Sequence, residues 1–121
     1  MVKFNRANEV VATAEIETPG MLALDPTTDL LYVGRSMSAV NSPPSLGVVE
    51  RSTMDADEVD IFFSRPHALV VSGELGQVYA ASLVENRVGS LSTREETLEL
   101  LTLDGPILTL VQFAIAPDGR P

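Results

Sequence analysis

The chain has no cysteine, no tryptophan and only 5% aromatic residues. Without cysteine it can form no disulfide, no thiolate metal site and no thiol nucleophile. Lysine and arginine total 8 against 17 acidic residues, which gives a formal net charge of −9. Such a charge repels phosphate backbones and anionic lipid surfaces. We therefore expect neither nucleic acid binding nor membrane insertion.

Long hydrophobic runs are also missing. The first 20 residues, MVKFNRANEVVATAEIETPG, alternate short apolar and polar stretches. They predict neither a signal peptide nor a membrane span within this chain. Hydrophobic residues nevertheless make up 45% of the 121 positions, which is enough for a packed core. The length fits one domain or part of one.

The sequence does contain a repeat. The stretch TPGMLALDPTTDLLYVGR, residues 18–35, aligns with RPHALVVSGELGQVYAAS, residues 65–82, at an offset of 47 residues. Pro19 then falls on Pro66, and Tyr32 falls on Tyr79. The turn recurs a third time as FAIAPDG, 44 residues after the second copy. Periods of this size are typical of solenoids, propellers and arrays.

Each unit is predicted to form four short strands, because its apolar runs are brief and bounded by Gly, Pro, Asp or Ser. The predicted strands are Met21–Leu24, Leu30–Val33, Leu46–Glu50 and Val59–Phe63 in the first unit, and Ala68–Val71, Gln77–Ala81, Arg87–Ser92 and Leu98–Leu103 in the second. A possible capping box, Ser92 to Glu95, would favour a helix in STREETLELL. The equivalent segment of the first unit alternates like a strand, so we expect a strand here too.

Four short antiparallel strands in about 40–45 residues are typical of one blade of a β-propeller. We therefore predict an all-β chain of roughly two and a half four-stranded antiparallel blades. Residues 1–17 would end a preceding blade as a hairpin turning at Arg6-Ala7-Asn8, residues 18–64 and 65–105 would each form a blade, and residues 106–121 would start the next. Leu24, Tyr32, Val71 and Tyr79 should lie buried between blades.

Propellers close with roughly 4–8 blades, so we expect this chain to be a fragment of a larger propeller. The alternative is a protomer that closes a ring by oligomerising. In either case the open blade faces and unpaired strand edges invite self-association.

The three repeat copies resemble the YVTN-type β-propeller repeats of bacterial and archaeal surface and periplasmic proteins. Their blade reads approximately P-x-x-hydrophobic-x-hydrophobic-S-P-D-G-x-x-hydrophobic-Y-V. Two features depart from that pattern: Ser72-Gly73-Glu74 replaces Pro-Asp-Gly, and the first unit carries the extra residues MSAVNSPPS. The matching positions are turn and core residues rather than catalytic ones.

The resemblance implies a non-enzymatic scaffold or binding module in the periplasm or outside the cell. Propellers of similar appearance include lactonases and proteins that hold haem or copper. The alternative function is therefore part of a lactonase-like or metal- or haem-dependent propeller enzyme. No cofactor is evident from the residues themselves.

Candidate site residues follow from strand direction, which places the second-to-third strand loops and the unit connections at one edge. Long loops carry function more often than tight turns, so a protein or small-molecule ligand is expected at this loop edge. His67, the only histidine, could ligate a metal or act as a base, or simply line a wet channel. Arg35 could clamp an anion or pair with a neighbouring carboxylate. Gln112 could hydrogen-bond a ligand or stabilise its own loop.

Other chemical signals are weak. DADEVD, residues 55–60, supplies three aspartates but lacks the Gly and the distal Glu of a calcium-binding EF-hand loop. We expect this segment to be a solvated hairpin turn. The sequence contains no Gly-x-Ser-x-Gly elbow, no Walker loop and no dinucleotide fingerprint. No pair of residues is recognisable from the sequence as a nucleophile and its base.

Overall fold

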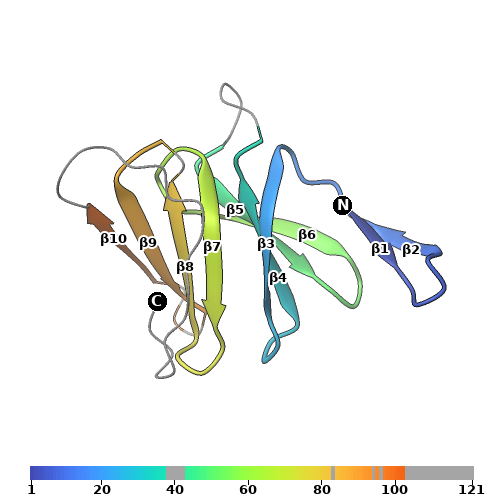
Figure 1. The fold of residues 1–121 in the computed structure, drawn as a ribbon. Helices are drawn as coiled ribbons and strands as arrows, with labels where there is room; N and C mark the ends of the chain where they lie inside the picture. The colour runs from blue at the N-terminus through green and yellow to red at the C-terminus, as the bar shows by residue number, and fades with distance from the viewer. Residues whose placement is uncertain (38–42, 83, 94, 96, 103–121) are drawn as a thin grey trace.

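All the regular structure in the described part of the chain is β-strand (Figure 1). The computed structural model describes residues 1–37, 43–82, 84–93, 95 and 97–102. The strands are β1 Val2–Phe4, β2 Val10–Thr13, β3 Pro19–Asp25, β4 Leu30–Arg35, β5 Ser45–Glu50, β6 Asp55–Asp60, β7 Pro66–Ser72, β8 Gln77–Ser82, β9 Arg87–Ser92 and β10 Leu98–Thr102. The predicted all-β class is confirmed. Within these residues no helix is long and apolar enough to cross a membrane.

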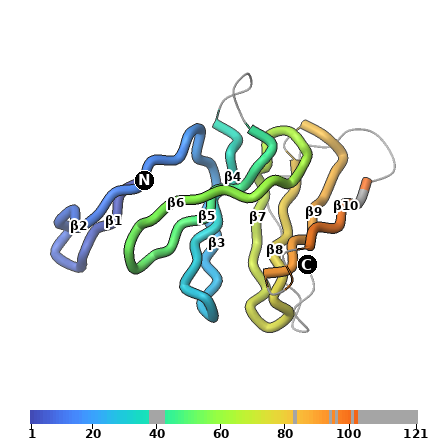
Figure 2. The backbone as a smooth tube through the Cα atoms, turned by 180° about the vertical axis from the view of Figure 1, so that it is seen from behind, coloured from blue at the N-terminus to red at the C-terminus, as the bar shows by residue number. Residues whose placement is uncertain are grey.

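The strands form three antiparallel sheets in simple chain order. β1 and β2 make a hairpin, β3 to β6 make a four-stranded sheet, here the first sheet, and β7 to β10 make the second sheet. Figures 1 and 2 show the second sheet on one side of the first sheet and the hairpin on the other. β7 of the second sheet contacts both β3 and β4 of the first.

The first two strands of each sheet repeat residue for residue. β3 and β7 have the same length and lie 47 residues apart, as do β4 and β8. The unusual backbone angles repeat at the same offset. Thr18 and Arg65, which precede the two first strands, have φ of 50° and 47°, and Asp29 and Gly76, which end the two turns, have φ of 60° and 64°. The predicted repeat is therefore present in the backbone conformation as well as in the sequence.

A side-chain to backbone hydrogen bond repeats as well. Arg35 Nε at the end of β4 donates to the carbonyl oxygen of Glu17 at 3.1 Å. Ser82 Oγ at the end of β8 donates to the carbonyl oxygen of Ser64 at 2.5 Å. In both sheets the end of the second strand is thus fixed to the segment that leads into the first strand.

The main core lies between the two sheets, where one face of each meets the other. Its buried members are Tyr32, Leu46, Ile61, Phe63, Leu69, Val78, Ala80 and Leu91. A smaller core lies on the opposite face of the first sheet, beneath the hairpin. Its buried members are Ala14, Val33, Val49 and Met54. Both faces of the first sheet are therefore at least partly covered.

The predicted fourth strand of the first unit is wrong in position. β6 begins at Asp55 rather than Val59, so DADEVD is a strand and not a hairpin turn. The chain reverses earlier, where Met54 at φ 62° donates its backbone N–H to the carbonyl of Glu50 at 2.7 Å. Ile61 and Phe63, which suggested the later strand, lie after β6 and are buried between the sheets.

The second unit follows its prediction closely. β9 has the predicted bounds, and β7, β8 and β10 match to within two residues over the described part. The possible capping box forms a turn instead of a helix. Glu95 donates its backbone N–H to Ser92 Oγ at 3.2 Å, and the chain then returns as β10 paired with β9.

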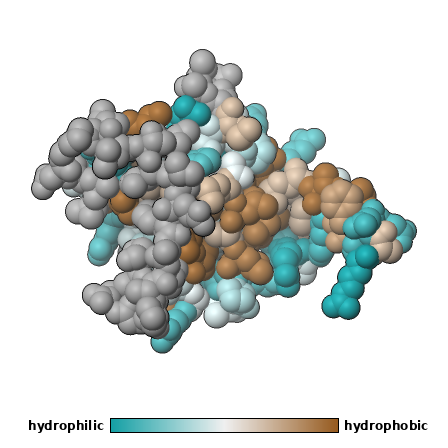
Figure 3. Space-filling model, viewed as in Figure 1, coloured by the Kyte–Doolittle hydropathy of each residue, from teal (hydrophilic) through white to brown (hydrophobic). Residues whose placement is uncertain are grey.

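Burial between the sheets agrees only in part with the prediction. Tyr32 is buried, Val71 and Tyr79 are half-buried, and Leu24 is 38% exposed. The prediction for Leu24 is wrong because the hairpin covers β4 and β5 and not β3. In Figure 3 hydrophobic residues gather at the surface over β3 and over the hairpin. Leu22, the other large apolar side chain of this patch on β3, is 51% exposed.

The repeat supplies a matched test of the inter-sheet core. Leu69 is 5% exposed, whereas Leu22, its equivalent 47 residues earlier, is 51% exposed. We expect Leu69→Ala to lower the free energy of unfolding by about 2–5 kcal/mol, because it leaves a cavity in the core. Leu22→Ala should cost less than about 1 kcal/mol. Urea unfolding followed by circular dichroism measures both, and equal losses would contradict the observed stacking.

Candidate functional site

Arg35 and His67 lie at the same end of the sheets, at the predicted loop edge. Arg35 ends β4, and His67 is the second residue of β7, the strand that contacts β4. Gln112, the third predicted site residue, lies outside the described residues. Its proposed role stays a prediction.

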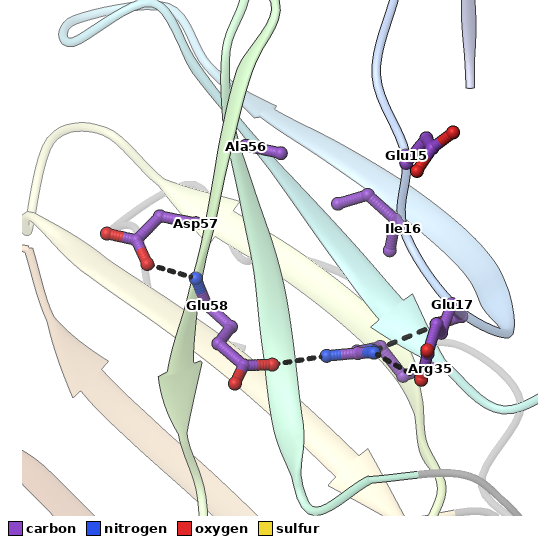
Figure 4. Close-up of a pocket in the computed structure, with 7 residues that line it drawn as sticks. All are labelled: Glu15, Ile16, Glu17, Arg35, Ala56, Asp57 and Glu58. Atoms are coloured by element: carbon purple, nitrogen blue, oxygen red, sulfur yellow. Dashed lines mark hydrogen bonds and ion pairs between the residues drawn. The ribbon is translucent and has the colours of Figure 1, made fainter.

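Arg35 is a nearly buried charged group at this edge, with a side chain only 7% exposed (Figure 4). Its Nη1 donates to Glu58 Oε2 at 2.6 Å and to Ser45 Oγ at 3.0 Å. Its Nε donates to the Glu17 carbonyl, and its Nη2 lies 3.9 Å from Glu17 Oε2. The guanidinium thus connects β4 to β5, to β6 and to the segment before β3.

A pocket of about 280 Å³ opens beside this guanidinium. It is lined by Glu15, Ile16, Glu17, Arg35, Ala56, Asp57 and Glu58. Ile16 can lie against the sheet because position 47 is a glycine. A Cβ there would stand 2.7 Å from Ile16 Cδ1.

The pocket is electrostatically negative. Its lining holds four carboxylates and one guanidinium, a formal charge of −3, and Arg35 already donates to Glu58. Arg35 therefore forms an ion pair with a neighbouring carboxylate, which was one of its two predicted roles. An anionic ligand would have to displace Glu58, so anion binding by Arg35 stays a prediction. The charge is complementary to a cationic group.

His67 lies beside a buried serine. Its Nδ1 is 2.5 Å from Ser36 Oγ, and the Arg65 guanidinium donates to the Ser36 carbonyl from Nε at 3.2 Å and from Nη2 at 2.8 Å. Glycine at position 34 permits this approach, since a Cβ there would lie 2.9 Å from the Pro66 carbonyl oxygen. These contacts tie the end of β4 to the start of β7.

The contact between Ser36 and His67 is of the kind that a nucleophile and its base require. Sequence analysis missed it because 31 residues separate the two partners. Ser36 is only 2% exposed, so its hydroxyl is closed to a substrate in this conformation. Among the described residues, no group of three or more His, Cys, Asp or Glu side chains is placed to hold a metal ion.

Asp25 is a second buried charge, at the turn between β3 and β4. Its Oδ1 accepts hydrogen bonds from Thr27 N at 2.9 Å and from Thr27 Oγ1 at 2.6 Å. Burial acts to raise the pKa of Asp25, but hydrogen bonds from Thr27 and Thr28 outweigh it and leave that pKa below its ordinary value. The pKa of Tyr32 is raised, mainly by burial and to a smaller extent by the negative charge of Asp25.

The buried ion pair can be compared with an exposed one. Arg35→Ala should lower the free energy of unfolding by about 2–4 kcal/mol, because several charge-assisted hydrogen bonds are lost at a buried position. Arg51, paired with Asp29 at 2.8 Å, is half-exposed, and Arg51→Ala should cost less than about 1 kcal/mol. Thermal and urea unfolding measure both variants. Similar losses would show that Arg35 has no special structural role.

Asp25 predicts a pH dependence of stability. Its folded-state pKa is lower than the ordinary value of 3.8, so its carboxylate stabilises the fold above about pH 4. That contribution is lost as the pH falls through the folded-state pKa. We expect Asp25→Asn to be less stable than the wild type at pH 7 and to lose less stability between pH 4 and pH 2. Urea unfolding across this range is the measurement, and parallel pH profiles would contradict the expectation.

Comparison with known proteins adds no precedent for this site. No protein-family model matches the sequence, and a search of curated proteins finds no significant match. Its chemistry therefore rests on the residues themselves. These are a guanidinium held by carboxylates, a histidine beside a buried hydroxyl and a surrounding excess of negative charge.

Proposed function

We propose that this chain belongs to a β-propeller that acts as a non-enzymatic binding scaffold. The observation that carries the proposal is the equivalence of the two four-stranded sheets. They share strand order, and the left-handed conformations at their turns and the side-chain to backbone bond at the end of the second strand repeat at an offset of 47 residues. Stacking of such sheets, with the first strand of one beside the first strand of the next, is how propeller blades assemble. β3 and β7 are in contact in this way.

The proposed ligand surface is the loop edge. Tight turns join β3 to β4 and β7 to β8 at the other edge, whereas Arg35, Ser36 and His67 lie where the longer connections meet. A rigid stack of sheets holding such connections is the usual basis of a binding scaffold. The negative pocket beside Arg35 favours ligands that carry a positive charge.

One observation favours the alternative, a part of a lactonase-like or metal- or haem-dependent propeller enzyme. Ser36 and His67 make the hydroxyl–imidazole contact that acyl transfer uses. For this pair to act, Ser36 must become accessible, and a metal-dependent reaction would need ligands in addition to His67.

The scaffold proposal predicts that the chain associates with itself through its open sheet face. Leu22 and Leu24 expose on β3 the positions whose equivalents on β7 pack against the first sheet. Light scattering over a range of concentrations should show a mass that rises with concentration. Leu22→Glu should reduce this rise, because it places a charge in the apolar contact.

Two results would overturn the proposal. A monodisperse monomer that melts cooperatively near 60 °C, a value typical of a mesophilic domain, would show that the sheet faces need no further partner. A stoichiometric metal, measured by elemental analysis of the same fractions, would favour the enzyme alternative over a non-enzymatic scaffold.

A further inference from the structure

β6 carries acidic residues that the stability of the first sheet does not explain. Its sequence is DADEVD, and every residue except the half-buried Val59 is exposed. Aspartate is depleted in strands. Glu58 has a structural role, because it accepts a hydrogen bond from Arg35. Asp55 instead lies opposite Glu50 in the register with β5, and like charges directly opposite each other destabilise a sheet.

β6 is also an edge strand. All six of its residues pair with β5 on one side, and no strand of the described chain pairs with it on the other. A free edge is a template on which a strand of another chain can add. One backbone donor of β6 is already occupied, because Asp57 Oδ1 accepts the N–H of Glu58 at 2.8 Å (Figure 4). An added strand would have to displace this carboxylate to use that N–H.

The register decides whether β6 of a second copy can be that added strand. In a symmetric dimer the two strands pair antiparallel about a two-fold axis perpendicular to the sheet, so each side chain meets side chains of its own face. One face of β6 carries Asp55, Asp57 and Val59, and the other carries Ala56, Glu58 and Asp60. The symmetric registers that pair at least three residues of β6 place opposite each other Asp55 and Asp57, two copies of Asp57, two copies of Glu58, or Glu58 and Asp60. Every such register therefore opposes carboxylates.

We infer that the acidic residues of β6 protect this edge and keep the first sheets of two copies from joining along it. Charged side chains on an edge strand are a common means of preventing such pairing. Association between copies is then left to the apolar face of β3, where Leu22 and Leu24 are exposed. The inference goes beyond the scaffold proposal, because it concerns a different surface and requires no closed ring of sheets.

The test removes two carboxylates from a chain whose β3 face is already blocked by Leu22→Glu. On this background the edge variant, Asp55→Ala with Asp57→Ala, relieves the opposed charges in two of the registers. Glu58 is kept because Arg35 donates to it. Alanine is itself depleted in strands, so a gain in pairing would not come from strand propensity. We expect light scattering to show self-association about tenfold stronger than in the background chain.

A control variant separates position from net charge. Glu9→Ala with Glu74→Ala, on the same background, changes the net charge equally at exposed positions away from β6. Its self-association should rise by less than about threefold. Association through other surfaces is common to both variants and cancels in the comparison. If circular dichroism shows that the edge variant is misfolded, Asp55→Asn with Asp57→Asn is compared with Glu9→Gln with Glu74→Gln.

A disulfide identifies the surface in contact, because the chain has no cysteine of its own. In the edge variant, Asp57→Cys replaces Asp57→Ala. The symmetric register centred on position 57 then brings two thiols together at a Cα separation of about 4.5–5.5 Å, which suits a disulfide. We expect a disulfide-linked dimer on a non-reducing gel after air oxidation. Glu74→Cys on the Leu22→Glu background should form little of it.

The inference is wrong if the edge variant associates no more strongly than the background chain, because the carboxylates then do not prevent pairing. It is also wrong if the edge and control variants associate equally, since net charge alone explains that result, or if Asp57→Cys and Glu74→Cys cross-link alike. None of these outcomes decides the scaffold proposal, which depends on association through β3 and on metal content in the chain with Leu22 intact.

Discussion

Burial of one thin sheet against the next is the constraint on which the rest of this structure depends. A four-stranded sheet has two broad faces and can cover neither by itself. The first sheet meets the second on one face and the β1–β2 hairpin on part of the other, and the two cores lie in these contacts. Where neither neighbour reaches, on β3, Leu22 and Leu24 stay open to solvent. The exposure of these two leucines is thus explained by the absence of a neighbour over this face of β3 in the described part of the chain.

Close stacking in turn requires the strand ends to be fixed. Gly34 lets β4 approach the start of β7, and the left-handed conformations of Thr18 and Arg65 direct the chain into the first strand of each sheet. Such conformations are costly for residues other than glycine, so the surrounding contacts have to hold them. At Arg65 the guanidinium supplies such a contact by donating to the carbonyl of Ser36, which directly follows β4 of the neighbouring sheet.

Sequence analysis predicted best where local turn chemistry determines the structure. β3, β4, β7 and β8 follow from the repeated Pro, Gly and Asp positions, because proline fixes φ and glycine and aspartate accept the conformations that tight turns need. β6 was misplaced because its acidic residues conceal the alternation of an edge strand, while Ile61 and Phe63 are buried in a connection. The predicted burial of Leu24 was wrong because burial on a sheet face depends on a neighbouring element, which the local sequence pattern does not specify. The Ser36–His67 contact depends in the same way on the stacking of two sheets.

The difference between the two units shows how a site can arise within a repeat. At equivalent positions Arg35 and Ser82 make the same bond, to the backbone carbonyl that precedes the first strand of their sheet. Ser82 Oγ also accepts the backbone N–H groups of Val84 and Glu85, at 3.1 and 2.9 Å, so its other contacts stay within the loop that follows β8. The longer arginine makes that bond with Nε and still reaches Glu58 on β6 with Nη1, so the first sheet acquires a charged pocket at a position whose structural role is already filled. Because either side chain makes this bond, the bond itself does not require arginine at position 35, and the charged pocket is a feature of the first sheet alone.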